Sequence, residues 1–204
     1  EIASCLVGSE MCIRDSPQTE RYFGNVNPIG IRSCYDEGKR CAETLCFDYM
    51  REYGARIKVI RIFNTYGPNM SMDDGRVVSN FIVQALNGEN ITIYGDGSQT
   101  RSFCYVDDLA DGCVYLMNNY SGNETVNMGT GKELTIKELT ELVAKVVGYT
   151  GEIKWDPTKP DGTPRKLLDV SKLEGLGWKY KTELEEGIRL TYDDFLHNPM
   201  RAER

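Results

Sequence analysis

The chain has 204 residues and a formal net charge of −7, with 40% hydrophobic and 27% charged residues. These values are typical of a globular protein that buries its core in one domain or two small ones. The acidic balance argues against nucleic acid and anionic membrane as main partners. No apolar run approaches the roughly 18 residues of a membrane span, and no basic start with an apolar centre marks a signal peptide.

The cysteines and the single histidine indicate a reduced protein without a metal site. Five of the seven cysteines stand mostly among apolar residues: Cys34, Cys41, Cys46, Cys104 and Cys113. They are therefore predicted to be reduced core thiols of a cytoplasmic protein. No C-x-x-C pair occurs, and the one histidine, His197, lies near the end of the chain. We expect no metal site.

Hydrophobic periodicity predicts helices alternating with strands along the chain. The expected elements are a helix over 35–53 closed by Gly54, an apolar strand over 57–63, a helix over 77–87, strands over 91–94 and 101–106 around the turn GDGSQT, a helix N-capped by Asp107 and running to about 117, and a strand over 125–129. Two T-x-x-E capping boxes, Thr135 with Glu138 and Thr182 with Glu185, each predict a further helix. The stretch 159–166 between them is predicted to be a charged loop.

This order of elements predicts an α/β fold with parallel strands. There are too few strands for a complete doubly wound sheet, and G-x-G-x-x-G is absent; the nearest motif, GTG at 129–131, lacks the third glycine. The expected fold is the C-terminal portion of a Rossmann-like doubly wound parallel sheet plus a small α/β substrate-binding domain.

Residues 1–16 differ in character from the loop-like PQTERYFGNVNPIG that follows. The stretch CLVGSEMCIRDS has neither a helical nor a strand period. It resembles a peptide that recurs at the ends of translated sequencing reads. We interpret residues 1–16 as a non-native leader; the alternative is a genuine leader segment.

Tyr35 and Lys39 are four residues apart at the start of the first predicted helix, so they share a face. An ammonium group beside a phenol favours the phenolate, which can serve as a general base at neutral pH. The spacing alone is equally typical of a surface pair, because a Y-x-x-x-K match arises easily by chance.

Several longer motifs around Tyr35 and Lys39 resemble, in the same order, those of a known enzyme family. SCYDEGKR, RIFNTYGP, DGRVVSNFI and ITIYGDGSQTRSFCYVDDL resemble the extended short-chain dehydrogenase/reductase (NAD-dependent epimerase/dehydratase) family. Within it, residues 17–106 resemble the UDP-glucuronate decarboxylases. The resemblance implies NAD as cofactor and a nucleotide sugar as substrate. It implies oxidation at C4, decarboxylation and re-reduction by the same NAD, giving UDP-xylose.

The resemblance also implies roles for individual residues. Tyr35 would accept the proton of the sugar 4-hydroxyl. Lys39 would hold the nicotinamide ribose and favour the Tyr35 phenolate. Thr65 and Arg76 would lie on the cofactor side.

Four residues are implied to bind the substrate: Tyr49, Asn64, Tyr94 and Arg101. Asn64 would meet the diphosphate, Tyr94 would line the uracil pocket, and Arg101 would pair with a phosphate. A guanidinium can fork onto phosphate oxygens, so Arg76 and Arg101 suit such roles. Without the resemblance, both are equally typical of solvated charges, and Tyr94 of the core.

Residues 110–202 show a second resemblance, to the GDP-L-fucose synthases, which use NADPH. It rests on VYLMNNYSGNETVNMGTGKELTIKEL, WDPTKPDGTPRKLLDVSKL and LTYDDFL. It implies that Asp161 and Arg165 touch the nucleotide end of the substrate; the alternative is a solvated loop that binds nothing. The histidine that this epimerisation requires is absent, because DDGR stands in the expected place.

Together these features predict residues 17–67 and 103–130 as part of a Rossmann domain, and 68–102 and 131–204 as a substrate domain. The expected partner is a UDP- or GDP-sugar, and a homodimer through the Tyr35–Lys39 helix is implied. The 204-residue chain alone is expected to bind NAD poorly and to be inactive. The remaining alternatives are a fucose-synthase-like enzyme and a non-catalytic chimeric fragment.

Overall fold

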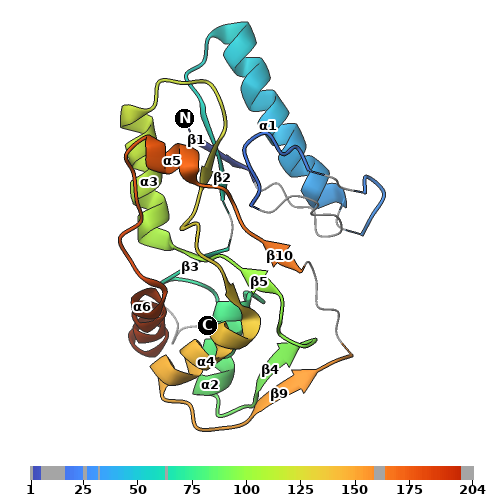
Figure 1. The fold of residues 1–204 in the computed structure, drawn as a ribbon, viewed down its shortest axis with the longest axis vertical. Helices are drawn as coiled ribbons and strands as arrows, with labels where there is room; N and C mark the ends of the chain where they lie inside the picture. Colours follow the sequence, from blue (N-terminus) through green and yellow to red (C-terminus); the bar gives the residue numbers. More distant parts are fainter. Residues whose placement is uncertain are drawn as a thin grey trace.

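The computed structural model describes residues 2–5, 17–24, 27–31, 33–62, 64–158 and 164–198. Its upper part in Figure 1 is a three-stranded parallel sheet. The strands, in spatial order, are β1 (Ile2–Cys5), β2 (Lys58–Ile62) and β7 (Val126–Met128). The helices around the sheet are α1 (Ser33–Tyr53), α3 (Val106–Asn119) and α5 (Ser171–Gly175). Figure 1 shows α1 on one side and α3 with α5 on the other.

The two faces of this sheet differ in chemistry. The face toward α3 and α5 is apolar: Ile60 and Met128 pack with Leu116 of α3, Leu173 of α5 and the nearby Trp178. The opposite face carries two buried polar residues, which are Arg61 of β2 and Asn127 of β7. The helix α1 therefore meets a polar sheet surface.

The strand β1 pairs in parallel with β2, from Ile2 opposite Lys58 to Cys5 opposite Arg61. The sequence showed no strand period after Cys5, and residues 6–16 lie outside the described residues. Residues 2–5 thus have a place in the sheet. Their interpretation as part of a leader stays a prediction.

The lower part of the molecule in Figure 1 consists of three helices and a strand pair. These are α2 (Val77–Leu86), α4 (Ile136–Val147), α6 (Leu184–His197), β4 (Ile91–Tyr94) and β9 (Ile153–Asp156). The strands β4 and β9 are parallel. A core around Phe81, Ile82, Ile93, Leu139 and Ile188 joins the three helices to β4.

Short strands lie between the two parts (Figure 1). The strands β3 (Thr65–Tyr66) and β6 (Cys104–Tyr105) form a parallel pair. A second sheet is mixed and has the spatial order β10 (Arg165–Lys166), β5 (Thr100–Arg101), β8 (Leu134–Thr135). In it, β10 is parallel to β5 and β8 is antiparallel to β5. The prediction of one strand over 101–106 is wrong, because β5 and β6 join different sheets. The strands around the turn GDGSQT do not pair with each other, since β4 pairs with β9.

The capping predictions have mixed outcomes. The box of Thr135 and Glu138 is confirmed, with both reciprocal hydrogen bonds present. The box of Thr182 and Glu185 is wrong, because α6 begins at Leu184 and the Thr182 amide donates to Asp108 Oδ2 at 2.8 Å. Asp107 is not an N-cap either; Tyr105 holds that position, without a side-chain cap.

The apolar stripe of α1 is not buried. None of the helix's residues is buried among the described residues, and Leu45, Tyr49 and Tyr53 are 52%, 55% and 71% exposed. Cys34 and Cys41 are exposed as well, so the prediction that they are core thiols is wrong. Cys104 is buried, as predicted.

Candidate functional site

Tyr35 and Lys39 lie one turn apart near the start of α1, as the sequence predicted. The ammonium of Lys39 is 5.6 Å from the centre of the Tyr35 ring, and the Tyr35 side chain is accessible, with 40% of the residue exposed. The helix holds these groups together because residues i and i+4 share a face. A phenol and an ammonium are therefore presented side by side.

Three predicted substrate residues line one cavity of about 260 Å³: Asn64, Tyr94 and Arg101. They come from separate elements, namely the turn after β2, the end of β4, and β5. Apolar side chains, among them Phe81 of α2 and Phe103, complete the lining together with polar ones such as Gln99. A concave site that combines apolar walls with convergent polar groups is typical of small-molecule binding.

Asn64 is held in a strained backbone conformation at the edge of this cavity. Its φ is 29°, which is uncommon for a residue with a side chain. Its amide nitrogen donates to the Ser102 carbonyl at 2.9 Å, and its own carbonyl accepts from the Cys104 amide at 3.2 Å. These bonds fix the turn that follows β2. Backbone strain of this kind is often found at functional sites.

Arg101 and Tyr94 bring a charge and an aromatic ring to the same cavity. Arg101 Nη1 donates to the Thr100 carbonyl at 2.7 Å, and Tyr94 is 53% exposed. Tyr94 is thus not a core residue. A guanidinium beside an exposed ring offers one group for a phosphate and one for a base.

The two residues expected on the cofactor side lie apart from this cavity's lining. The Thr65 hydroxyl is buried and has no hydrogen-bond partner among the described residues. Arg76 precedes α2 and pairs with Asp74 at 3.3 Å, with a largely exposed side chain. The described residues thus include one orphaned hydroxyl beside Asn64 and one exposed guanidinium.

Arg165 is not among the residues that line the cavity. Its Nε lies 2.9 Å from both carboxylate oxygens of Glu133, and this ion pair holds the pKa of Glu133 below its ordinary value. Tyr49 lies on the exposed stripe of α1, with its ring centre 5.3 Å from that of Tyr53. Asp161 lies outside the described residues. Arg165 lies opposite Thr100 on the strand beside Arg101, but neither Arg165 nor Tyr49 lines the cavity of Asn64, Tyr94 and Arg101.

Sequence reasoning missed a buried ion pair behind the Tyr35–Lys39 face. Arg61 is 3% exposed and binds Glu43, which lies one turn after Lys39 on α1. A charged residue inside the apolar run IKVIRIF was the available signal, because a buried arginine needs a partner. No feature of the sequence around Glu43 indicates that it is this partner.

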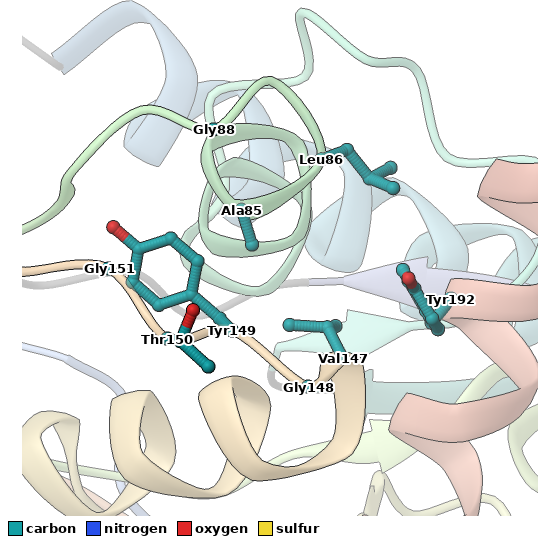
Figure 2. Close-up of a pocket in the computed structure, with 9 residues that line it drawn as sticks. All are labelled: Ala85, Leu86, Gly88, Val147, Gly148, Tyr149, Thr150, Gly151 and Tyr192. Carbon is teal, nitrogen blue, oxygen red and sulfur yellow. The ribbon is translucent and has the colours of Figure 1, made fainter.

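A second cavity of about 350 Å³ lies where the C-terminal ends of α2 and α4 approach α6. Figure 2 shows Ala85 facing Val147, with Tyr149 on one side and Tyr192 of α6 on the other. The Tyr149 hydroxyl donates to the Glu89 carbonyl at 2.8 Å, which joins the ends of the two helices. None of the residues predicted to bind cofactor or substrate lines this cavity.

No group of three or more His, Cys, Asp or Glu residues in the described ranges is arranged to hold a metal ion. In the same part of the chain, no helix has the length and apolar character to cross a membrane.

Comparison with known proteins identifies the class. The chain matches the model of the NAD dependent epimerase/dehydratase family over residues 4–129, and it belongs to that family. This confirms the predicted superfamily and its NAD dependence at family level.

Within this family, the chain is similar to curated UDP-glucuronic acid decarboxylases. The chain is 54% identical over 182 residues to UDP-glucuronic acid decarboxylase 3 of Arabidopsis thaliana and 50% identical over 180 residues to UDP-glucuronic acid decarboxylase 1 of Xenopus tropicalis. Each match covers 88% of this chain, but 52% and 42% of the relatives, so the chain spans about half their length.

These alignments leave only about 22 residues of the chain unmatched. They therefore run through 106–110, where the two resemblances were expected to meet. The decarboxylase likeness is longer than the motifs over 17–106 indicated. The fucose-synthase likeness of residues 110–202 stays a prediction.

Solved structures agree on the fold. A UDP-glucose 4-epimerase of Thermotoga maritima with UDP-glucose superposes with a TM-score of 0.85 and 32% identity, covering 96% of this chain and 62% of the other. The enzyme of the same name from Thermus thermophilus, in complex with NAD, gives 0.79 and 28%, covering 96% and 63%. The predicted Rossmann-like α/β fold is confirmed.

Proposed function

We propose that this chain carries the Tyr–Lys pair and the nucleotide-sugar pocket of a UDP-glucuronate decarboxylase, which forms UDP-xylose. The observation that carries the proposal is the 50–54% identity to decarboxylases, which extends over 88% of the chain. The cavity of Asn64, Tyr94 and Arg101 supports it with groups suited to a phosphorylated aromatic ligand.

The described residues fit one end of an NAD molecule. Tyr35 and Lys39 offer a hydroxyl and an ammonium side by side, and the orphaned Thr65 hydroxyl has an unused hydrogen-bonding capacity. We propose that Tyr35, Lys39 and Thr65 hold the nicotinamide half, with Arg76 on the same side. When bound, NAD supplies hydride acceptance at C4 and returns the hydride after decarboxylation, so it is not consumed.

Tyr35 performs the proton transfer. Its phenolate takes the proton of the sugar 4-hydroxyl as C4 becomes a ketone, and the phenol returns that proton on re-reduction. The Lys39 ammonium lies beside this group, 5.6 Å from the centre of the Tyr35 ring. The 4-ketone makes the substrate a β-keto acid. Its C5–C6 bond breaks, the C6 carboxylate leaves as carbon dioxide, and the enolate that remains takes a proton at C5 from solvent before the 4-ketone is reduced again.

Asn64, Tyr94 and Arg101 bind the nucleotide. Arg101 meets the diphosphate charge, the Asn64 side chain fixes the turn beside it, and the exposed ring of Tyr94 stacks with the base. Contacts of Tyr49, Asp161 and Arg165 with the substrate stay predictions of the family resemblance, because none of the three lines the cavity among the described residues. We infer a preference for UDP over GDP, because the curated relatives at 50–54% identity are named for a UDP-sugar.

We also propose a homodimer and a cytoplasmic location. The exposed apolar stripe Leu45, Tyr49 and Tyr53 supports a dimer through α1, because exposed apolar patches commonly mark interfaces. Cysteine usage supports a reducing compartment, because Cys34, Cys41, Cys104 and Cys113 form no disulfide in the described part of the chain.

The test separates binding from turnover. Residues 17–204 are fused to the matching N-terminal half of the Arabidopsis decarboxylase 3, and UDP-xylose formation from UDP-glucuronate and NAD is measured. We expect turnover by the fusion, loss of it in Y35F, and none by the 204-residue chain alone. A fusion that folds and binds UDP-glucuronate but makes no UDP-xylose would contradict the proposal.

A further inference from the structure

The helix that carries Tyr35 and Lys39 has no fully buried apolar side chain; Cys46, Phe47 and Met50 are half-buried. It is 21 residues long, yet none of its residues is buried among those described. A groove of about 580 Å³, lined in part by Phe23 and Cys41, runs beside it. Helices in globular proteins are usually positioned by burial of an apolar face. Some other contact must therefore set where α1 lies on the sheet.

A buried ion pair provides that contact. Arg61 of β2 donates from Nε to Glu43 Oε2 at 3.1 Å and from Nη2 to Glu43 Oε1 at 2.6 Å. The Arg61 side chain is 4% exposed and the Glu43 side chain 14%. Two parallel hydrogen bonds fix both the distance and the orientation of a guanidinium and a carboxylate. The pair thus fixes Glu43, and its turn of α1, relative to β2.

Further hydrogen bonds extend the pair into a network. Arg61 Nη1 donates to the carbonyls of Glu20 and Tyr22 at 3.0 and 2.9 Å, so the segment before α1 is held by the same guanidinium. The Thr125 hydroxyl, just before β7, donates to Glu43 Oε1 at 3.2 Å. The carboxylate therefore contacts both strands β2 and β7, which limits rotation of α1 about its own axis.

Other ion pairs of α1 cannot perform this task. Arg40 pairs with Glu37 at 3.4 Å, and both side chains are more than 40% exposed. Arg51 pairs with Asp48, again within the helix and in solvent. Pairs between residues of one helix stabilise that helix slightly but do not attach it to a sheet.

Spacing links the network to the chemistry. Tyr35, Lys39 and Glu43 follow one another at intervals of four, so they lie along one face of α1. We propose that Glu43 and Arg61 are positioning residues that set the axial position and rotation of α1, and thereby aim the Tyr35 hydroxyl and the Lys39 ammonium. That this orientation matters for catalysis rests on the proposed function. That the ion pair fixes the position of α1 does not.

A buried pair of this kind contributes little net stability but specifies one geometry. Replacing only Glu43 leaves the buried charge of Arg61 unpaired, whereas replacing both residues leaves no buried charge. Comparing the two variants therefore separates the effect on the position of α1 from the effect on the free energy of unfolding. A double variant with two apolar side chains of similar size should keep the fold while releasing the helix from its fixed geometry.

The experiment uses the 204-residue chain in four forms: wild type, E43Q, the double variant E43L/R61M, and E37Q as the matched control. E37Q removes a carboxylate of the same helix that pairs only in solvent. Amide hydrogen exchange is measured in α1 and in α4, which serves as the internal reference. The ring resonance of ¹³C-labelled Tyr35, assigned with Y35F, reports its surroundings by NMR. Neither readout needs substrate or turnover.

In E43Q we expect exchange in α1 to rise about tenfold or more with α4 unchanged, because a hydrogen bond to a charged group typically contributes at least that factor. In E43L/R61M we expect an unchanged unfolding midpoint or a higher one, together with a displaced Tyr35 resonance. E37Q should match the wild type in both readouts.

Three results would overturn the proposal. One is equal exchange of α1 in E43Q and E37Q. Another is a Tyr35 resonance that E43L/R61M leaves in place, which would assign the pair to stability alone. The third is a parallel rise of exchange in α1 and α4 in every folded variant, which would make the pair a general stabilising element. Failure of the decarboxylase assay, by contrast, would leave all of these readouts as they are.

Discussion

Gly187 of α6 lies directly against Tyr66 of β3, so the motif that follows β2 packs on the last helix. A Cβ at position 187 would overlap the Tyr66 hydroxyl and would lie 2.8 Å from Tyr66 Cζ and 3.0 Å from Tyr105 Cδ2. The Tyr66 hydroxyl also donates to the Leu184 carbonyl at 3.3 Å. The contact joins α6 to the strand that leads from Asn64.

The close approach makes G187A strongly destabilising. Neither aromatic ring can withdraw easily, because both are buried, so overpacking should cost about 1–3 kcal/mol of the free energy of unfolding. Urea denaturation checks this. G175A is the matched control, since a Cβ at that helical glycine meets nothing within 4 Å. It should be neutral or slightly stabilising, and equal losses in both variants would contradict the packing argument.

A second prediction concerns Asp108, which holds the turn before α6. This residue is 4% exposed, and its carboxylate accepts from the amides of Lys181 and Thr182 at 3.1 and 2.8 Å. D108A would leave two amides without their acceptor, at a cost of about 1–3 kcal/mol. The neighbouring D107A removes an exposed carboxylate and should change the unfolding free energy by less than about 1 kcal/mol. Thermal unfolding of the two variants separates the roles, and similar losses would argue against the turn's dependence on Asp108.

Elements of the fold could be predicted from the sequence where the residues that determine them are close together in the chain. The capping box of α4 and the parallel sheet were predictable because their signals lie within a few residues. The start of α6 was not, since the amide of Thr182 is occupied by Asp108, 74 residues away. The strand expected over 101–106 is two strands, because β5 pairs with β8 and β10 whereas β6 pairs with β3. No pattern within 101–106 indicates these distant partners.

The candidate site shows the same limit. Asn64, Tyr94 and Arg101 were assigned to one ligand through a family resemblance, and the structure brings them to one cavity. No pattern in the sequence joins Arg61 to Glu43, 18 residues apart. Cys34 and Cys41 of α1 were wrongly expected to be core thiols, because apolar neighbours in the sequence do not show what covers a helix face.

A third prediction follows from the buried thiol of Cys104. Burial, and next the charge of Asp108, raise the pKa of Cys104 from its ordinary 9.0 to about 12. The folded state thus keeps this proton when the unfolded state has lost it. Stability linked to this group is complete below pH 9 and falls as the pH rises from about 9 toward 12.

Two measurements check the behaviour of Cys104. Urea unfolding at pH 7 and pH 10.5 should show a smaller loss of stability with pH in C104A than in the wild type. At neutral pH a thiol reagent should modify the exposed Cys34 and Cys41 of the folded chain and leave Cys104 unmodified until urea is added. Modification of Cys104 at the rate of Cys41 in the folded chain would contradict both expectations.

The last prediction separates two arginines that were both expected to bind the nucleotide. Arg101 of β5 lines the cavity, whereas the guanidinium of Arg165 on the paired strand β10 is engaged by Glu133, which directly precedes β8. Charge-assisted bonds to phosphate contribute about 1.5–3 kcal/mol, so R101M should weaken UDP binding roughly ten- to a hundredfold. R165M should weaken it less than about threefold, because its charge is already neutralised by a carboxylate. Calorimetric titration of UDP and GDP into both variants, with the solvent-exposed R189M as control, measures these effects. A larger loss in R165M than in R101M, above all for GDP, would move the nucleotide to the region that resembles the fucose synthases and away from the cavity of Asn64 and Tyr94.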